Sequence, residues 1–502
     1  MQAPGREAVG GLCYQRHRPE ETLLYELVET QYPALLDHLA GQGKSLPDFV
    51  REEFEAYLKC GRLEHGFLRV QCESCHLERL VAFSCKKRGF CPSCGARRMA
   101  ETAALLCEEV FPVVPLRQWV ISFPFALRFL FATHPRAMTE ALGIVYRTLA
   151  THLAQQAGYR SSDVASGAVT LIQRFGSALN LNIHFHVLMI DGVYIPADNG
   201  TPQFRRVKAP GRAELEILVQ RISQRVGRRL ERMGLLVRDA ESDHLDLPPP
   251  DDHDPMPQLL GSSVSYRIAL GQQQGRKAFM LQTLTPLTGA DLTGERVATC
   301  SGFSLHAGVS CETHQRDKRE RLCRYISRPP LAVKRLSLSR HGKVVYTLKT
   351  PWRDGTTQVM FEPLDFIARL AALVPRPRIN LTRYHGILAP HHRWRAAITP
   401  AKRGTGARDH NQTDERTPAE RHAAMTWAQR LKRVFDIDVS TCARCGAAVR
   451  VIACIEEQGV IDRILAHLRE KETKRPAPPI LLPPSRAPPL TLSSPAIDVA
   501  QA

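Results

Sequence analysis

The pattern of apolar and polar residues divides the middle of the chain into predicted strands and helices. Residues 119–123 (WVISF) read as a strand that Pro124 ends, and residues 136–157 carry apolar side chains at helical spacing. Further strands are predicted at 169–175 and 182–187, with Gly176 and Ser177 between them. Beyond them the same reasoning predicts helices at 208–236, 314–328 and 364–373 and a hairpin formed by 344–348 and 358–361.

Shifts in composition along the chain mark the expected domain boundaries. Residues 1–110 begin with helical patterns and continue into a cysteine-rich segment, and residues 111–395 hold most of the predicted strands and helices. Residues 239–258 are acidic and rich in proline, which is typical of an exposed linker or insertion. The remaining parts are expected to be a mobile linker (396–425), a small cysteine-containing unit (426–472) and a disordered, proline-rich tail (473–502).

The charge and the cysteine content narrow the class of protein. Lys and Arg exceed Asp and Glu by 18 in the 502 residues, which favours nucleic acid as partner over a small acidic metabolite. The sequence has neither an uncharged apolar stretch of the ~18 residues that a membrane span needs nor an apolar signal-peptide core near its start. We therefore expect a cytoplasmic protein, nucleoid-associated in a bacterium, with no membrane partner. Six of the fourteen cysteines form three C-x2-C pairs, which favours metal binding over a disulfide scaffold.

Two of the C-x2-C pairs have the spacing of a zinc ribbon. Cys72 and Cys75 are followed, after fifteen residues, by Cys91 and Cys94. Two such knuckles complete a tetrahedral Zn²⁺ site with no open position, so the predicted zinc is structural. The alternative is four free cysteines paired by chance.

Other cysteines and histidines offer further, weaker metal sites. Cys60, His65 and Cys85, joined by His76, could hold a second zinc ion, or they could be ordinary residues beside a single site. Near the C-terminus, Cys442 and Cys445 are half of a ribbon, with Cys454 as a possible third ligand and no evident fourth.

A group of basic side chains surrounds the predicted ribbon. A rigid, basic knuckle of this kind suits contact with the phosphate backbone of DNA. The alternative is a solvated basic face. The candidate DNA-binding residues are Lys86, Lys87, Arg88, Arg97 and Arg98.

The strand predicted at 182–187 carries two histidines on one face. Its period of two sends Asn182, His184 and His186 to one side and apolar residues to the other. Two imidazoles side by side on a strand can bind one divalent cation, although an isolated His-x-His pair is more often incidental. Here the strand is apolar, where unpaired polar groups are costly, and Gln173 and Arg174 lie on the preceding strand.

The helix predicted at 314–328 carries a tyrosine in a row of basic side chains. Spacing of three and four places Lys318, Arg321, Tyr325 and Arg328 on one stripe. One interpretation is a surface tyrosine stacked on arginine. The other is a phenolate nucleophile beside guanidinium groups that bind phosphate.

These stretches together resemble the HUH-type (His-hydrophobic-His) transposases of the insertion-sequence ninety-one family and its common-region relatives. The similarity covers roughly residues 50–395, in the order of that family. The matching stretches are 72–98 (CESCHLERLVAFSCKKRGFCPSCGARR), 173–193 (QRFGSALNLNIHFHVLMIDGV), 321–330 (RLCRYISRPP), 351–363 (PWRDGTTQVMFEP) and 383–390 (RYHGILAP).

The resemblance implies an α+β fold with a relaxase-like HUH nuclease core, in which helices flank an antiparallel sheet, preceded by a zinc-ribbon-type module. The histidine pair would lie on a central strand and bind Mg²⁺ or Mn²⁺ through His184 and His186, with Tyr325 as the residue that attacks the scissile phosphate. The better-known members have two tyrosines four residues apart, but here Arg321 and Pro329 occupy those positions. The chain therefore resembles the single-tyrosine branch, and Gln173 is our candidate for the third metal ligand.

The implied activity is cleavage and rejoining of single-stranded DNA at the ends of a mobile element, through a 5′-phosphotyrosine. Arg321 and Arg328 would neutralise the phosphate charge. Tyr384 is an alternative nucleophile. Two other functions remain open: a zinc-ribbon DNA-binding protein without catalysis, and a hydrolytic metal nuclease that uses water. A transposase with three catalytic carboxylates is disfavoured, because no acidic trio stands in strand and helix context.

Overall fold

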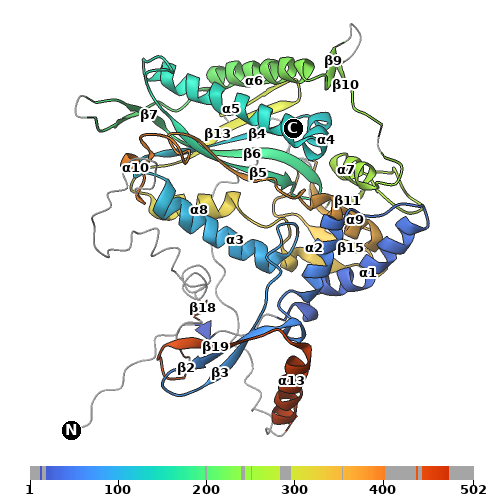
Figure 1. The fold of residues 1–502 in the computed structure, drawn as a ribbon. Helices are drawn as coiled ribbons and strands as arrows, with labels where there is room; N and C mark the ends of the chain where they lie inside the picture. Colours follow the sequence, from blue (N-terminus) through green and yellow to red (C-terminus); the bar gives the residue numbers. More distant parts are fainter. Residues whose placement is uncertain are drawn as a thin grey trace, which may run out of the picture. The chain divides into compact units, whose positions relative to one another are not determined.

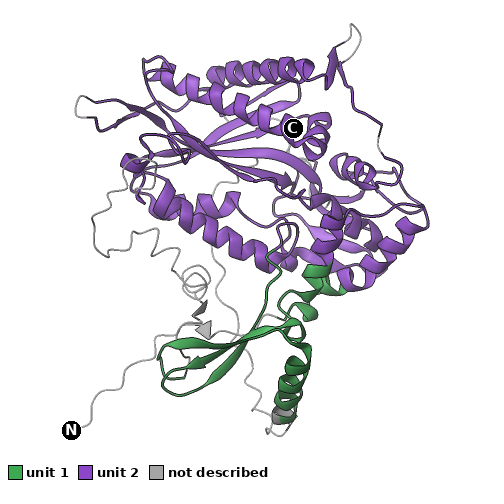
Figure 2. Cartoon of the chain, viewed as in Figure 1, with its two compact units in different colours: residues 1–26, 55–86, 426–498 green, residues 27–54, 87–425, 499–502 purple. Residues whose placement is uncertain are grey.

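The computed structural model describes residues 12–13, 18–197, 200–238, 243–249, 251–282, 296–352, 354–401, 437–438, 442 and 444–473. In this part of the chain no helix has the length and apolar character needed to cross a bilayer. The chain divides into two compact units (Figure 2). Unit 1 comprises residues 1–26, 55–86 and 426–498, and unit 2 comprises residues 27–54, 87–425 and 499–502.

A six-stranded antiparallel sheet is the centre of unit 2 (Figure 1). Its strand order is β12-β13-β4-β6-β5-β17, so β6, the strand with the two histidines, lies between β4 and β5. All ten residues of β6 are buried, because helices cover both faces of the sheet. The strands are β12 (Val297–Cys300), β13 (Phe303–Cys311), β4 (Leu116–Ser122), β6 (Leu181–Ile190), β5 (Gly167–Phe175) and β17 (Thr382–Gly386).

The two faces of this sheet have different partners. The face with the histidines packs against α3 (Pro92–Leu105), the π-helical turn Leu106–Val110 and α8 (Arg316–Ile326), in one apolar cluster that includes Leu188, Leu322 and Ile326. On the other face, Phe185 packs edge-on against Phe123 and is stacked with Phe131 of α4. The helices α4 (Phe125–Thr133), α5 (Pro135–Gln156) and α6 (Arg212–Arg232) pack against one another and against strands of this sheet.

A buried ion pair joins three parts of the central sheet. The guanidinium of Arg117 on β4 donates two hydrogen bonds, of 2.9 and 2.7 Å, to the carboxylate of Asp191 at the end of β6. A third bond, of 2.9 Å, goes to the backbone oxygen of Ala307 on β13. Both side chains are almost fully buried, so each charge depends on the other for its stabilisation.

Smaller elements complete unit 2. A four-stranded sheet has the order β11-β16-β15-β14, and α7 packs against α9. Two hairpins, β7-β8 and β9-β10, stand apart from both sheets. The bounds are β11 (Phe279–Gln282), β16 (Thr356–Phe361), β15 (Val344–Thr347), β14 (Leu336–Leu338), α7 (Met256–Val264), α9 (Pro363–Leu373), β7 (Gly192–Ile195), β8 (Gln203–Arg206), β9 (Leu236–Arg238), β10 (Asp243–Leu245) and α10 (Arg395–Ile398). Two further helices, α1 (Leu23–Ala40) and α2 (Asp48–Lys59), also lie mostly in this unit.

Unit 1 combines segments from both ends of the sequence. Its sheet has the order β19-β2-β3, in which β19 (Val449–Ile455) pairs with β2 (Phe67–Cys72), and β3 (Glu78–Ala82) pairs with β2 on its other edge. Phe67 packs with Ile461 and Leu465 of α13 (Gln458–Thr473). The unit also holds β1 (Leu12–Cys13), which pairs with β18 (Ile437–Asp438).

The observed elements follow the predicted ones closely in unit 2, and the mixed α+β class with an antiparallel sheet is confirmed. The predicted strands and helices between residues 119 and 373 are all present, with bounds that differ by a few residues. The described part of the expected linker or insertion 239–258 contains β10 and the start of α7. One expectation differs from the structure: β19, within the C-terminal segment 426–472, shares a sheet with β2, so it belongs to the same unit as residues 55–86. Most of the expected linker 396–425 and the tail after residue 473 lie outside the described residues.

Candidate active site and metal centres

The imidazole rings of His184 and His186 converge on the histidine-bearing face of β6. Their Nε2 atoms lie 3.1 Å apart. The Nδ1 atom of His184 lies 2.9 Å from the backbone oxygen of Asn182, which can only accept a hydrogen bond. Nδ1 therefore carries the proton, and the lone pair of Nε2 is available for a metal ion.

Gln118 on β4 sets the orientation of the second ring. Its amide nitrogen Nε2 lies 2.7 Å from Nδ1 of His186. A half-turn of the amide would set its oxygen there instead; Nδ1 would then donate the hydrogen bond and leave Nε2 of His186 as a second available ligand. Gln118 was not among the predicted site residues, although a polar residue inside an apolar strand was the signal that could have found it.

Gln173 lies directly opposite His184 in the ladder between β5 and β6. Residues paired in this way project from the same face of a sheet. The Oε1 atom of Gln173 is 3.3 Å from Nε2 of His186, and its amide nitrogen donates a 3.3 Å hydrogen bond to the backbone oxygen of Ile326. The geometry thus brings two imidazole nitrogens and one amide oxygen together at one point.

Burial keeps both histidines neutral. Desolvation lowers the pKa of His184 to about 4, against a smaller opposing effect of the Asn182 carbonyl, and Arg328 and Arg128 lower it further. Desolvation also lowers the pKa of His186 well below its ordinary value, with contributions from His184 and Arg328. Neutral imidazoles are the form that ligates metals.

Tyr325 stands next to this group because α8 packs on the same face of the sheet. Leu322, Cys323 and Ile326 are buried, whereas Tyr325 is 37% exposed. Its ring meets the ring of His186 edge-on, with centroids 5.9 Å apart. The predicted tyrosine helix is therefore real, and it places a phenol beside the histidine pair while leaving it open to solvent.

Two cations flank the ring of Tyr325. The guanidinium of Arg328 lies 4.3 Å from the ring centroid, and the ammonium of Lys349 lies 5.9 Å from it. Lys349 follows β15 and was not foreseen, since nothing in the local sequence connects it with α8. Arg321, one turn before Tyr325, is exposed, and Arg328 is the arginine of the predicted stripe that contacts the tyrosine.

The alternative nucleophile, Tyr384, occupies a different place. It lies on β17, two strands from β6 in the sheet order, and pairs with Val169. Its ring packs against the apolar cluster of this face, and burial raises its pKa. A half-buried phenol in such surroundings is a poorer nucleophile than an open one beside cations.

The structure corrects the predicted zinc ribbon. Cys72 and Cys75 do not share a site with Cys91 and Cys94; their partners are Cys442 and Cys445, and all four sulfur atoms lie within 4.8 Å of one another. The sulfur atoms of Cys72 and Cys445 are 3.4 Å apart, as are those of Cys75 and Cys442. The half-ribbon near the C-terminus is therefore completed by the N-terminal knuckle.

Backbone amides favour the thiolate form of two cysteines at this four-cysteine site. The amide of Cys75 points at the sulfur of Cys72 over 3.5 Å, and this contact is the main cause of a lowered pKa of Cys72. The amide of Arg444 is the main cause that holds the pKa of Cys442 at about 6. Four thiolates with this spacing are a closed set for structural Zn²⁺. Cys454, the possible third ligand, is exposed on β19 and is not a member of the group.

Cys60 and Cys85, two of the residues predicted for a second zinc ion, lie together in unit 1, where the backbone amide of Cys85 is 3.2 Å from the sulfur of Cys60. His65 and His76 of the same unit belong to no cysteine group within the described residues. Cys91 and Cys94 lie at the start of α3 in unit 2.

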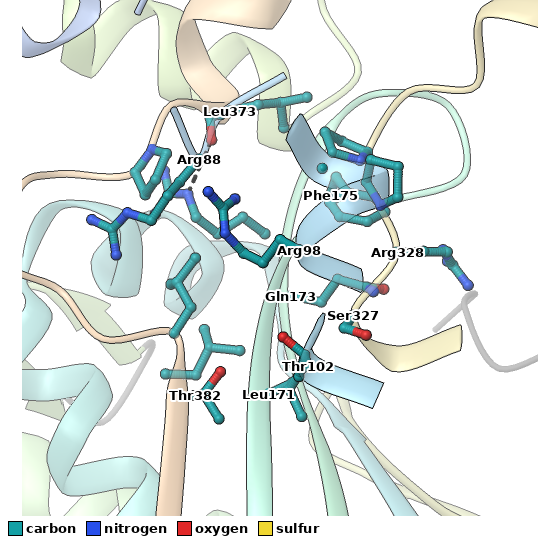
Figure 3. A pocket seen from close by; sticks show the side chains of 18 of the residues that line it. Arg88, Arg98, Thr102, Leu171, Gln173, Phe175, Ser327, Arg328, Leu373 and Thr382 are labelled. Atoms are coloured by element: carbon teal, nitrogen blue, oxygen red, sulfur yellow. Dashed lines mark hydrogen bonds between the residues drawn. The ribbon is translucent and has the colours of Figure 1, made fainter. Parts of the chain in front are cut away.

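Three of the predicted DNA-binding residues line a cavity beside the candidate active site. Lys87, Arg88 and Arg98 surround it together with Gln173 and Arg328 (Figure 3). Arg97 instead forms a 3.1 Å ion pair with Glu101 on α3, and Lys86 is exposed in the loop after Cys85.

Comparison with known families assigns the class of protein. A transposase family matches residues 167–396, which include the histidine pair, Gln173 and Tyr325. The transposase zinc-binding domain matches residues 27–123, which include Cys60 to Cys94. No curated protein and no solved structure matches the chain.

The protein is a transposase, an enzyme class whose partner is DNA. The two models together match well over half of the chain, in the order expected from its motifs, and they place it in the insertion-sequence ninety-one family of transposases. The match to a zinc-binding domain also supports structural zinc at the cysteine groups. Cys442 and Cys445 lie beyond both matched regions.

Proposed function

We propose that this transposase cleaves and rejoins single-stranded DNA at the ends of a mobile element by metal-assisted transesterification. The observation that carries the proposal is the convergence of His184, His186 and Gln173 beside the exposed ring of Tyr325. Together with the central position of β6, this arrangement supports a relaxase-like HUH core.

The donor set fits a divalent cation. Two imidazole nitrogens and an amide oxygen would hold it, and the remaining positions would be left for water and a phosphate oxygen. A nitrogen-rich set suits Mn²⁺ better than Mg²⁺, which prefers oxygen ligands. When bound, such a cation polarises a non-bridging oxygen of the scissile phosphodiester and fixes its orientation.

The side chains around Tyr325 supply the rest of the chemistry. The phenol oxygen of Tyr325 attacks phosphorus, the P–O3′ bond breaks, and the released 3′ oxygen takes up a proton while the phenol proton passes to solvent. The product is a 5′-phosphotyrosine and a free 3′-OH. Arg328 and Lys349 lie close enough to stabilise negative charge on the phenol and the phosphate. Because the bond energy is kept in the phosphotyrosine, a 3′-OH can reverse the reaction at a new junction without ATP.

The test is covalent capture of DNA. Purified protein is incubated with end-labelled single strands from the element ends and Mn²⁺, and the products are separated on a denaturing protein gel. We expect label to migrate with the wild-type protein and with the matched control Tyr384→Phe, but not with Tyr325→Phe or His184→Ala.

Two outcomes would refute the proposal. Cleavage without attached label that survives Tyr325→Phe would indicate a hydrolytic nuclease with water as nucleophile. Binding of the correct ends without cleavage would indicate a DNA-binding protein in which the histidines and the tyrosine have no catalytic role.

A further inference from the structure

A cavity of about 120 Å³ lies beside the candidate active site in unit 2 (Figure 3). Its walls come from the first turns of α3, the residues after α8, the end of α9 and the strand β5. Gln173, the candidate metal ligand, and Ser327 and Arg328, which follow Tyr325, are part of the lining. Gln173 and Arg328 thus connect the cavity with the candidate active site.

The lining is strongly basic. It contains the cations Lys87, Arg88, Arg98, Arg174 and Arg328, and none of the described residues that line it is acidic. The space exceeds what a single water needs and accommodates a small anionic group.

The guanidinium groups at this cavity are oriented by backbone oxygens. Arg88 donates a 2.6 Å hydrogen bond to the backbone oxygen of Ile379, and Arg98 donates one of 3.1 Å to that of Lys87. Arg174 is almost fully buried and donates to the backbone oxygens of Leu373 and Ala372. A carbonyl fixes a guanidinium in position but does not neutralise its charge.

The nearby acids offset only part of this charge. Glu52 pairs with Lys87 at 3.0 Å, and neither side chain of that pair is buried. Glu53 is buried and accepts a 2.6 Å hydrogen bond from the amide of Gly89; burial raises its pKa, against smaller opposing effects of that amide, Lys87 and Arg98. Burial and, to a smaller degree, the neighbouring Arg98 lower the pKa of Arg88. Like charges held together at a cavity without an acidic lining are typical of a site for an anion.

We propose that this cavity holds an internal backbone phosphate of the DNA strand, next to the scissile phosphate. Planar guanidinium forks match phosphate oxygens in pairs, and two such groups, Arg88 and Arg98, meet here. The contact would hold the strand on one side of Tyr325 and so position the scissile phosphate. The inference rests on the proposed function, because only a DNA strand at Tyr325 brings a neighbouring phosphate to this place.

The test measures binding in a protein that cannot cleave. In the Tyr325→Phe background, without added Mg²⁺ or Mn²⁺, the affinity for a fluorescent twelve-nucleotide oligothymidylate is measured by anisotropy at several salt concentrations. We expect Arg88→Gln with Arg98→Gln to weaken binding about tenfold and to reduce the salt slope by about 0.7 for each phosphate that the protein no longer neutralises. Arg232→Gln, on the exposed face of α6, is the matched control for removal of a surface charge.

A second pair of variants distinguishes the effect of charge on binding from an effect of misfolding. Thr102 lines the cavity without a charge of its own. Thr102→Glu introduces a carboxylate and should weaken binding as strongly as the arginine variants, whereas Thr102→Gln, of nearly the same size, should not. Equal effects of Glu and Gln, or an unchanged salt slope in every variant, would overturn the proposal.

The source of the phosphate is tested separately. The affinities of oligothymidylates with and without a 5′-phosphate are measured for the protein with Thr102 and for Thr102→Glu. Equal affinities for the two ends support an internal phosphate, and a charge effect confined to the 5′-phosphorylated strand would overturn that assignment. Because this readout needs neither metal nor Tyr325, loss of covalent capture with intact phosphate binding would refute the cleavage mechanism and leave the cavity assignment standing.

Discussion

Replacing Cys442 and Cys445 by serine should remove the zinc ion that they share with Cys72 and Cys75. These two cysteines complete the four-cysteine site of unit 1. A tetrahedral ion with Zn–S bonds of about 2.3 Å requires sulfur atoms about 3.8 Å apart. The 3.4 Å pairs and the 4.8 Å limit of the group bracket that value, so an ion fits with small movements.

The magnitude of the effect follows from the separation of the two knuckles along the chain. Cys75 and Cys442 are 367 residues apart. Treated as a cross-link, a contact over this separation removes about 6 kcal/mol of conformational entropy from the unfolded chain by the loop-closure relation. Apparent binding free energies of structural zinc, about 10–16 kcal/mol, are sufficient to offset that entropy. Without the ion, the pairing of β19 with β2 and the contacts of α13 with Phe67 would have to hold the C-terminal segment alone.

The assay combines metal content with limited proteolysis. Elemental analysis of Cys442→Ser with Cys445→Ser should give one zinc ion per chain fewer than in the wild type, and a protease should cut between β19 and α13 much faster than in the wild type. Cys454→Ser is the matched control, since Cys454 lies exposed on the same strand and outside the group. An unchanged zinc content in the double variant would refute the reasoning. It would instead favour a ribbon in which Cys72, Cys75, Cys91 and Cys94 bind one ion.

Three further predictions follow from the unit 2 geometry. Gln118→Leu removes the partner of Nδ1 of His186, so the Mn²⁺ concentration for half-maximal DNA cleavage should rise about 10–100-fold while the thermal midpoint changes little. Asp191→Asn leaves Arg117 buried without its counter-charge and should lower the free energy of unfolding in urea by about 3–5 kcal/mol, whereas Glu216→Gln, in the exposed pair with Arg212, should cost less than about 1 kcal/mol. Burial lowers the pKa of His385 from its ordinary value of 6.5 to about 4, so the unfolded chain binds a proton that the native state does not, and stability is lost as pH falls from 6.5 towards 4. Between pH 7 and pH 5 this amounts to about 2 kcal/mol, and His385→Phe, which keeps the stacking on Tyr146, should lose that part of the pH dependence; equal pH dependence of variant and wild type would contradict the assignment.

The strand with the two histidines and the helix with the tyrosine could be predicted from sequence because each follows a local period. On β6 the period of two places His184 and His186 on one face whatever the neighbouring strands do. On α8 the buried residues Leu322 and Ile326 define one stripe, which leaves Tyr325 at its edge. Which of the surrounding residues contact them depends on the tertiary structure. Gln118 and Lys349 come from elements far away in sequence, and no local pattern connects them with the histidines or the tyrosine.

The zinc ligands show the limit of spacing arguments. A C-x2-C knuckle is a complete local unit with two thiolates, so any two knuckles in a chain can in principle share an ion. Spacing favoured the pair closest in sequence, Cys72–Cys75 with Cys91–Cys94. The pairing of β19 with β2 instead determines which knuckles share a site, because it brings Cys442 and Cys445 to Cys72 and Cys75. Cys72 and Cys445 are 373 residues apart, and a strand pairing over such a distance leaves no signal near the cysteines themselves.

The third candidate metal ligand, Gln173, depends on strand register, which the composition of β5 does not determine. Register is well specified where one face of a strand is apolar and the other polar, because a slip of one residue exchanges the faces. All of β5 except its last residue is buried, and both of its faces mix apolar with polar side chains, so either parity would satisfy the hydrophobic pattern. The observed pairing sets Gln173 opposite His184 and Leu171 opposite His186. A slip of one residue would set Ile172 or Arg174 opposite His184 and turn the amide of Gln173 to the far side of the sheet. The difference between a three-ligand site and a bare histidine pair thus lies in one step of register.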